Sequence, residues 1–482
     1  MFVRSFCDSN NDGIGDLNGI TSKLDYLQDL GIEAIWLTPF FKSPTYHKYD
    51  VTDYREIDPE YGTMTDFERL ISQAHQRNIR VIVDLVINHT SIQHRWFLEA
   101  KKGADNSYRN FYNWLTPQKI NELGIAQREK TADSLETNPW HWAKNDAKND
   151  KEKYYGMFWS GMADLNMDEP RVRKEIYDVG KFWLNKGVDG FRMDAAKHIY
   201  PDDEAGKTHA FWEEFRREME TVNPDFYIVG EVWTTAEKVA PFFRGLKANF
   251  NFDLSYGIQD IVLLGSDSKG IVKMLLENYA IFAKQNPDFI DATMLTNHDQ
   301  NRIGSVAKGN TSKLKLAANL LLTLPGNPFI YYGEELGMKG VKPDEGIREA
   351  FLWDTRWQDK DRTNWRKPKY NTDSRTTPLK QQKEDANSIY NHYRKLIHLR
   401  NSQPALSQIS PPNLRESPVS VSPNTLVAFI RPHENGDLLI VQNITAKAVK
   451  YSFPEHKEII LDELSTIQRN VVSPFALIIV KL

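Results

Sequence analysis

The chain has 482 residues and a formal net charge of −4 at pH 7, which gives no electrostatic reason to expect a nucleic acid or an anionic membrane as partner. Cys7 is the only cysteine, so a disulfide within the chain is excluded and the compartment is not indicated. The longest apolar stretch, residues 314–324, is too short to span a bilayer. We therefore expect no membrane insertion. The length suffices for about three domains or for one large barrel with additions.

Strands and helices are expected to alternate along most of the chain. Residues 1–6 read as the end of a strand, without an evident signal peptide. Thr65 and Glu68 match a capping box that opens one helix, and Gly187 has the position of a left-handed glycine that closes another. Further strands are expected at residues 34–37, 80–86, 188–193, 227–231, 249–253, 291–297 and 328–334. Further helices are expected at residues 20–30, 206–222, 268–285, 311–324 and 387–402.

Two regions interrupt or follow this βα pattern. Residues 90–166 are polar and dotted with aromatic side chains, which predicts a small inserted domain because a structureless loop of this length is improbable. After residue 402 the period changes to two, and Asn435-Gly436 is a strong hairpin signal. We predict an α/β fold: a (β/α)8 TIM barrel over 1–89 and 167–402, the insert after strand 3, and a C-terminal antiparallel β-sandwich domain over 403–482.

Four of the expected strands end in polar side chains that suit catalysis. They deliver Asn88-His89, Arg192 with Asp194, Glu231, and Asn297-His298-Asp299. By itself the pair of Arg192 and Asp194 indicates a structural ion pair slightly more than a catalytic one, although the arginine would keep the carboxylate ionised. The carboxyl ends of barrel strands share one rim, so four such endings together favour an active site.

Four segments of the chain resemble the signature regions of the α-amylase family of glycoside hydrolases. These segments are Asp84–His89, Gly190–His198, Gly230–Trp233 and Thr296–Asp299, in the family's order. With the further motifs below, the resemblance covers nearly the whole chain. It implies an enzyme that acts on starch, maltooligosaccharides or related α-glucans, without an organic cofactor.

The resemblance also implies the catalytic roles. Asp194 is expected to be the nucleophile, Glu231 the general acid/base, and Asp299 the carboxylate that binds the sugar hydroxyls and stabilises the transition state. The anomeric configuration is retained in the family, which requires carboxyl groups about 5 Å apart. Repulsion from Asp194 and Asp299 is expected to raise the pKa of Glu231 so that it can hold a proton.

Substrate-binding residues are expected on the loops around these carboxylates. Tyr49 resembles the tyrosine that stacks under the sugar being cleaved, and both His89 and His298 are expected to donate hydrogen bonds to its hydroxyls. Exo-acting α-glucosidases of the family place an aspartate where this chain has Tyr46, so Tyr46 favours cleavage of internal bonds. The full expected set is Tyr46, Tyr49, His89, Arg192, Lys197, His198 and His298.

A loop of oxygen donors near the N-terminus suits a hard divalent cation. It is not an EF-hand, since no helix precedes it, and an ion-free Asx-rich turn is the alternative. The family resemblance implies calcium, sometimes magnesium, at this loop. The expected ligands are Asp8, Asn10, Asp12, the carbonyl of Ile14, and Asp16.

A second calcium is implied by the resemblance alone. In many α-amylases an asparagine, an aspartate and a histidine backbone carbonyl share a calcium that joins the insert to the barrel. The matching residues here are Asn88, Asp164 and His198.

The expected function is hydrolysis of internal α-1,4-glucosidic bonds through a covalent glycosyl-enzyme. Three alternatives use the same residues: an exo-acting α-glucosidase, a glucanotransferase and a trehalose-forming isomerase. A binding or transporter subunit without catalysis is a fourth, but relatives of that kind lose carboxylates that this chain keeps. The chain is expected to be monomeric and to bind no nucleic acid. The compartment stays open, with secretion or a periplasmic location favoured if starch is the substrate.

Overall fold

The computed structural model of the protein consists of two compact units. Unit 1 comprises Met1–Glu33, Arg77–Ile79 and Thr234–Leu482, and unit 2 comprises Ala34–Gln76 and Arg80–Trp233. The structure describes residues 1–128, 137–143, 150–201, 204–419, 422, 424–462, 467 and 470–482.

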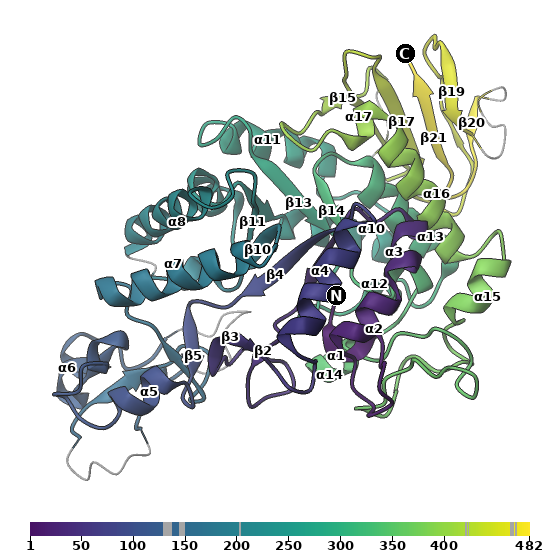
Figure 1. Cartoon of the computed structure of the whole chain (residues 1–482). Coiled ribbons are helices and arrows are strands. Elements are labelled where there is room, and N and C mark those ends of the chain that lie inside the picture. Colours follow the sequence, from purple (N-terminus) through teal and green to yellow (C-terminus); the bar gives the residue numbers. More distant parts are fainter. Residues whose placement is uncertain are drawn as a thin grey trace. The chain divides into compact units, whose positions relative to one another are not determined.

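Unit 2 is built on four parallel strands in the order β1-β4-β10-β11. Their bounds are Ala34–Leu37, Arg80–Leu85, Gly190–Met193 and Tyr227–Gly230. The connections between them include the helices α4 (Met64–His75), α7 (Pro170–Asn185) and α8 (Ala205–Glu220), and α7 packs beside α8 (Figure 1). The two central strands are almost entirely buried, as expected for strands covered on both faces. Their register pairs Arg192 with Asp84.

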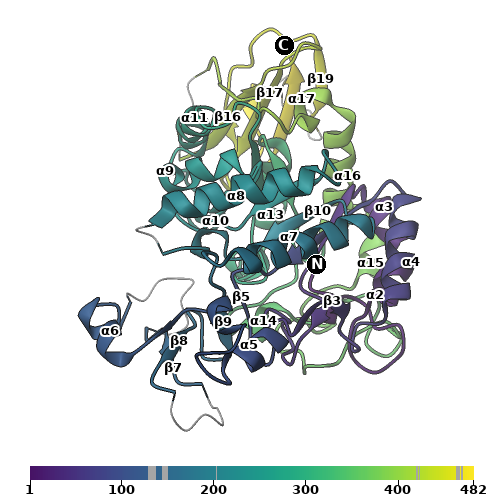
Figure 2. The same ribbon diagram turned by 60° about the vertical axis from the view of Figure 1, so that its left-hand side comes forward.

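The segment between β4 and α7 has its own secondary structure. The first and last strands of this segment, β5 (His89–Ser91) and β9 (Met162–Asp164), pair in antiparallel orientation. Beyond them, the helices α5 (Arg95–Ala100) and α6 (Pro117–Glu122) accompany a three-stranded sheet (Figure 2). That sheet has the order β6-β8-β7, with bounds Trp114–Leu115, Lys153–Tyr155 and Trp140–His141. Residues 129–136 and 144–149 of this segment lie outside the described part of the chain.

Unit 1 contains three further parallel strands in the order β12-β13-β14. Their bounds are Ala248–Phe250, Ile290–Met294 and Asn327–Phe329, and the helices around them are α10 (Phe252–Leu264), α11 (Ile271–Phe282) and α13 (Thr311–Thr323). The strand expected at 249–253 stops early because the side chain of Asn251 accepts a hydrogen bond from Leu254 N at 2.8 Å and caps α10. The strand expected at 328–334 ends at Phe329, and the chain turns at Gly333, where φ is +83°.

Three local predictions near the N-terminus are wrong. Residues Val3–Phe6 form the one-turn helix α1 instead of a strand end. The carbonyls of Arg4 and Ser5 accept hydrogen bonds from the loop amides of Gly15 and Phe351 at 2.8 and 2.9 Å, so they are not available to a strand partner.

The helix expected at 20–30 is in fact two helices, α2 (Leu17–Ser22) and α3 (Leu24–Leu30), and α3 ends at left-handed Gly31 as expected. The capping box of α4 uses Thr63 and Asp66 in place of Thr65 and Glu68, because the helix already begins at Met64.

The C-terminal region forms antiparallel sheets, as predicted. After α16 (Ile389–Ser402), a five-stranded sheet has the order β15-β16-β17-β21-β19. Its strands are Arg415–Glu416, Leu426–Arg431, Leu438–Asn443, Leu477–Lys481 and Glu458–Leu461. A small second sheet, β18 (Val449–Lys450) with β20 (Val471–Val472), packs on it through a shared apolar core. Among the described helices, none combines the length and the apolar composition that a membrane span requires.

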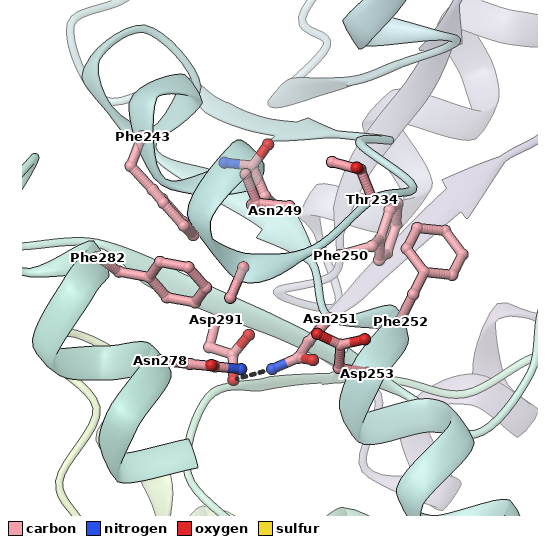
Figure 3. Close-up of a pocket in the computed structure, with 12 residues that line it drawn as sticks. Thr234, Phe243, Asn249, Phe250, Asn251, Phe252, Asp253, Asn278, Phe282 and Asp291 are labelled. Carbon is pink, nitrogen blue, oxygen red and sulfur yellow. Dashed lines mark hydrogen bonds between the residues drawn. The ribbon is translucent and has the colours of Figure 1, made fainter. Parts of the chain in front are cut away.

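A small cavity of about 10 Å³ lies among β12, β13 and α11, with room for about one water molecule (Figure 3). Asp291, which is 1% exposed, lines it. The carboxylate of Asp291 accepts hydrogen bonds from Asn251 Nδ2 at 3.0 Å and from Tyr279 Oη at 2.8 Å. Burial outweighs these two bonds and raises the pKa of Asp291 to about 6.

This shift predicts that Asp291 weakens the fold as the pH rises. The folded chain holds the Asp291 proton up to about pH 6, whereas the unfolded chain releases it near pH 4, so stability falls between these values and stays lower above them. We expect Asp291→Asn to be more stable than the wild type by up to about 3 kcal/mol at pH 8, and by only about half of that at pH 5, where the folded wild type still holds the proton.

Denaturant unfolding at both pH values measures this difference. Asp288→Asn, which changes an exposed carboxylate nearby in the sequence, is the matched control and should show no pH-dependent gain. A gain for Asp291→Asn that is equal at pH 5 and pH 8 would contradict the assignment.

Candidate active site

Arg192 is the centre of a charged cluster in unit 2. Its Nη1 donates hydrogen bonds to Asp84 Oδ1 at 2.9 Å and to Asp194 Oδ1 at 2.6 Å, while its Nη2 lies 2.6 Å from Glu231 Oε1. The arginine side chain is 1% exposed, whereas those of Asp194 and Glu231 retain 11% and 14% exposure. One buried guanidinium therefore fixes two partly accessible carboxylates, which are the expected nucleophile and acid/base.

The electrostatics of the cluster follow from burial and pairing. Burial disfavours the charge of Arg192, but the adjacent carboxylates of Asp84 and Glu231 overcome this and raise its pKa well above the ordinary value. For Asp84 burial dominates and raises its pKa, with Arg192 acting in the opposite direction. The contact between Arg192 and Glu231 is unexpected, since the sequence predicted only negatively charged neighbours for Glu231.

Asp84 was not predicted to act at the site, although it begins one of the signature segments. Besides Arg192, its carboxylate accepts hydrogen bonds from Tyr49 Oη at 3.0 Å and from Trp36 Nε1 at 3.1 Å. The Arg192 guanidinium also lies over the rings of Trp36 and Tyr49, at 5.1 and 5.8 Å from their centroids. Asp84 thus positions Arg192 and the predicted stacking tyrosine together. Its signal in the sequence is a charge inside an otherwise apolar strand.

Lys48 anchors the loop that carries Tyr46 and Tyr49 through two ion pairs. The lysine side chain is 3% exposed and pairs with Asp58 at 2.8 Å and with Glu60 at 2.7 Å. Its backbone has a left-handed φ of +65°, which is unusual for a side chain with a Cβ. This anchor fixes the backbone between the two tyrosines.

His89 is buried beside this loop. Its Nε2 lies 3.1 Å from the carbonyl oxygen of Tyr49, and burial lowers its pKa. A neutral ring must therefore donate from Nε2 to that carbonyl, so in the free protein the expected sugar contact of His89 is used to hold the Tyr49 backbone.

Phe158, an aromatic residue of the inserted segment, contacts both His89 and His198. The ring of Phe158 makes edge contacts with His89 at 5.2 Å and with His198 at 5.9 Å. Next to His198, Lys197 Nζ donates to the carbonyl of Trp233 at 3.0 Å. Sequence reasoning did not single out Phe158, because it lies in no motif.

Two of the expected residues, His298 and Asp299, lie in unit 1, after β13. Asp299 Oδ2 lies 3.1 Å from His298 Nε2, and Asp299 Oδ1 accepts a hydrogen bond from Arg348 Nη2 at 2.8 Å. Arg348 also donates from Nε to the carbonyl of His298 at 3.0 Å. This arginine comes from the long loop over 335–386, and no sequence signal marked it. The convergence of Asp299 with the carboxylates of unit 2 stays a prediction.

The N-terminal loop has the oxygen donors of a calcium site but also satisfies them internally. The carboxylate of Asp8 accepts hydrogen bonds from backbone amides of the loop, and that of Asp16 caps α2. Asn10 Nδ2 donates to Asp12 Oδ2 at 3.0 Å. Within the described part of the chain, no group of three or more His, Cys, Asp or Glu side chains could hold a metal ion. The loop has oxygen donors of the type that a hard cation binds, but in this structure they accept hydrogen bonds from the loop itself.

The second expected metal site contains a buried carboxylate. Asp164, on β9, is 5% exposed and accepts hydrogen bonds from Met157 N at 3.3 Å and from the side chain of Asn88. Burial raises the pKa of Asp164 to about 7. A buried carboxylate beside a carboxamide supplies oxygen ligands, and a bound cation would compensate the buried negative charge. These two residues therefore fit the expected calcium site.

Comparisons with known proteins show which family the chain belongs to. A sequence profile of the alpha amylase catalytic domain matches residues 1–408. Alpha-amylase 3 of Dictyoglomus thermophilum is 42% identical over 489 residues, covering 100% of this chain and 92% of that protein. A 4-alpha-glucanotransferase of Thermotoga maritima is 35% identical over 398 residues, covering 81% of this chain and 84% of that protein. The crystal structure of an alpha-amylase from H. orenii has a TM-score of 0.87 and 40% identity, covering 100% of this chain and 98% of that one.

The parallel strands, the carboxylates at their ends and the matching structures together define a glycosidase with an α/β barrel-type fold. Within that class, the chain belongs to the α-amylase family of glycoside hydrolases. The predicted family, fold class and enzyme class are thereby confirmed.

Proposed function

We propose that the protein is a retaining hydrolase that cleaves internal α-1,4-glucosidic bonds of starch and maltooligosaccharides. The observation that carries the proposal is the shared guanidinium of Arg192, which binds Asp194 and Glu231 at 2.6 Å each. Two carboxyl groups on one guanidinium are close neighbours, which suits the separation of about 5 Å found in retaining enzymes better than the wider spacing of inverting ones.

In the proposed mechanism Glu231 protonates the departing glycosidic oxygen while Asp194 attacks the anomeric carbon. The bond to the leaving sugar breaks as the bond to Asp194 Oδ forms, giving a covalent glycosyl-enzyme. Water then attacks the same carbon, Glu231 takes its proton, and Asp194 leaves as the carboxylate. Arg192 keeps Asp194 ionised and aligned for the attack, and Asp299 binds sugar hydroxyls.

Internal cleavage is supported by Tyr46, which occupies the position where exo-acting relatives have an aspartate that binds a chain end. Transfer of the glycosyl group to a second sugar is the competing function, and the 35% identity to a 4-alpha-glucanotransferase favours it as the second candidate. The two differ only in whether water or a sugar hydroxyl attacks the intermediate.

Product analysis over time separates these functions. The substrates are soluble starch and a maltooligosaccharide whose non-reducing end is blocked, with Asp194→Asn as the inactive control. We expect early maltooligosaccharides of mixed length and cleavage of the blocked substrate. Glucose alone would indicate exo-action, and products longer than a short donor would indicate transfer.

We propose further that calcium binds the loop of residues 8–16 and the site around Asn88 and Asp164. Bound calcium would stabilise the folded state by mass action. We expect chelation with EDTA to lower the thermal unfolding midpoint and added Ca²⁺, but not Na⁺, to restore it. Asp12→Ala removes an exposed donor of the loop without touching the α2 cap and should diminish the restoration. A midpoint that does not respond to EDTA would contradict calcium binding.

A further inference from the structure

Trp357 is unusual among the tryptophans of the loop over 335–386. It is 93% exposed, and no other large hydrophobic side chain of this loop, all of which the structure describes, is exposed. By contrast, Trp353 and Trp365 donate their indole N–H groups at 2.8 Å to Phe6 O and to Ser5 Oγ. The exposure of Trp357 is therefore specific to its position and not a property of the loop.

The turn that carries Trp357 is firmly built. The carbonyl of Thr355 accepts hydrogen bonds from the backbone amides of Gln358 and Asp359, at 2.8 and 2.9 Å. Asp359 Oδ2 accepts a hydrogen bond from Arg362 Nε at 3.0 Å, and Arg362 also pairs with Asp373. Asp373 in turn accepts a hydrogen bond from Arg356 N at 2.7 Å. The backbone on both sides of the ring is thus fixed, so binding at Trp357 would cost little ordering entropy.

The surroundings of the ring are polar. Arg356, Gln358 and Lys360 are exposed neighbours in sequence, and the Arg356 guanidinium carbon lies 6.0 Å from the ring centroid. A protein-docking surface would require a contiguous apolar patch. A single flat ring with hydrogen-bond donors around it suits a ligand with one apolar face and a polar edge, as a pyranose has.

We propose that Trp357 is a surface binding site for α-glucan chains, in which the indole stacks on a glucose ring and Arg356 and Gln358 bind its hydroxyls. The inference rests on the proposed function for the identity of the sugar. Its effect is to hold the polymer on the protein without taking part in bond cleavage.

Affinity electrophoresis in gels that contain soluble starch tests the site. All variants carry Asp194→Asn so that the polymer is not degraded. We expect Trp357→Ala to weaken the apparent affinity about tenfold, the effect of losing roughly 1.4 kcal/mol of stacking. Trp357→Tyr, which keeps an aromatic face, should retain most of the binding. Leu264→Ala removes another exposed apolar side chain, 63% exposed, and should change nothing.

Two results would overturn the proposal: unchanged affinity in Trp357→Ala, or an equal loss in Leu264→Ala. Hydrolysis of a short maltooligosaccharide, measured in proteins that retain Asp194, distinguishes failure of this proposal from failure of the proposed function. We expect Trp357→Ala to hydrolyse it at the wild-type rate. Failure of the wild type to hydrolyse it would refute the proposed function, whereas unchanged starch affinity would refute only the role of Trp357.

Discussion

Asp194→Asn is expected to abolish hydrolysis of α-glucans, with a loss in kcat of about 10⁴-fold or more. The amide has nearly the shape of the carboxylate but cannot form the glycosyl-enzyme, because it is a poor nucleophile. The hydrogen bond from Arg192 Nη1, now at 2.6 Å to Asp194 Oδ1, can still be made to the amide oxygen. We therefore expect the variant to fold and to keep its affinity for substrate.

The measurement is the initial rate on a soluble maltooligosaccharide, together with the thermal unfolding midpoint. Asp178→Asn, a change on the exposed surface of α7, serves as the matched control and should retain full activity. An Asp194→Asn protein that folds and still hydrolyses within tenfold of the wild-type rate would refute the assignment of the nucleophile.

Arg192→Lys is expected to impair both activity and stability. A lysine ammonium is a point charge and cannot hold Asp84, Asp194 and Glu231 at once, as the guanidinium does. Asp84 is fully buried, so weakening its pairing leaves a poorly compensated charge, at a cost of about 3–5 kcal/mol. Misalignment of the two catalytic carboxylates should lower kcat at least about 10²-fold.

Denaturant unfolding and initial rates measure the two effects separately. Arg216→Lys makes the same exchange at a partly exposed helical position, where the arginine pairs with Glu220, and should be nearly neutral. Arg192→Lys with the stability and activity of the wild type would show that the shared guanidinium does not organise the site.

The residues that sequence reasoning found are those at ends of strands in recognisable motifs. Asp194 and Glu231 could be placed together because they follow neighbouring parallel strands, whose register is set by buried apolar residues. The antiparallel hairpin around Asn435 and Gly436 could be predicted for a similar reason, since its turn chemistry is local.

The residues that sequence reasoning missed act through contacts that no local pattern reports. Arg348 reaches Asp299 from 49 positions away, and Phe158 reaches His89 from the inserted segment. The prediction of a strand end at the N-terminus was wrong because the carbonyls there accept hydrogen bonds from the amides of Gly15 and Phe351, which no local pattern indicates. Tertiary hydrogen bonds of this kind override local propensity.

The anomeric configuration of the first product tests the central claim most directly. Proton NMR recorded in the first minutes of hydrolysis distinguishes the α-anomer from the β-anomer before mutarotation mixes them. Double displacement through Asp194, with Glu231 as acid and then base, predicts that the new reducing end is α, as in the substrate. A β-configured first product would show single displacement by water and would contradict a covalent glycosyl-enzyme on Asp194.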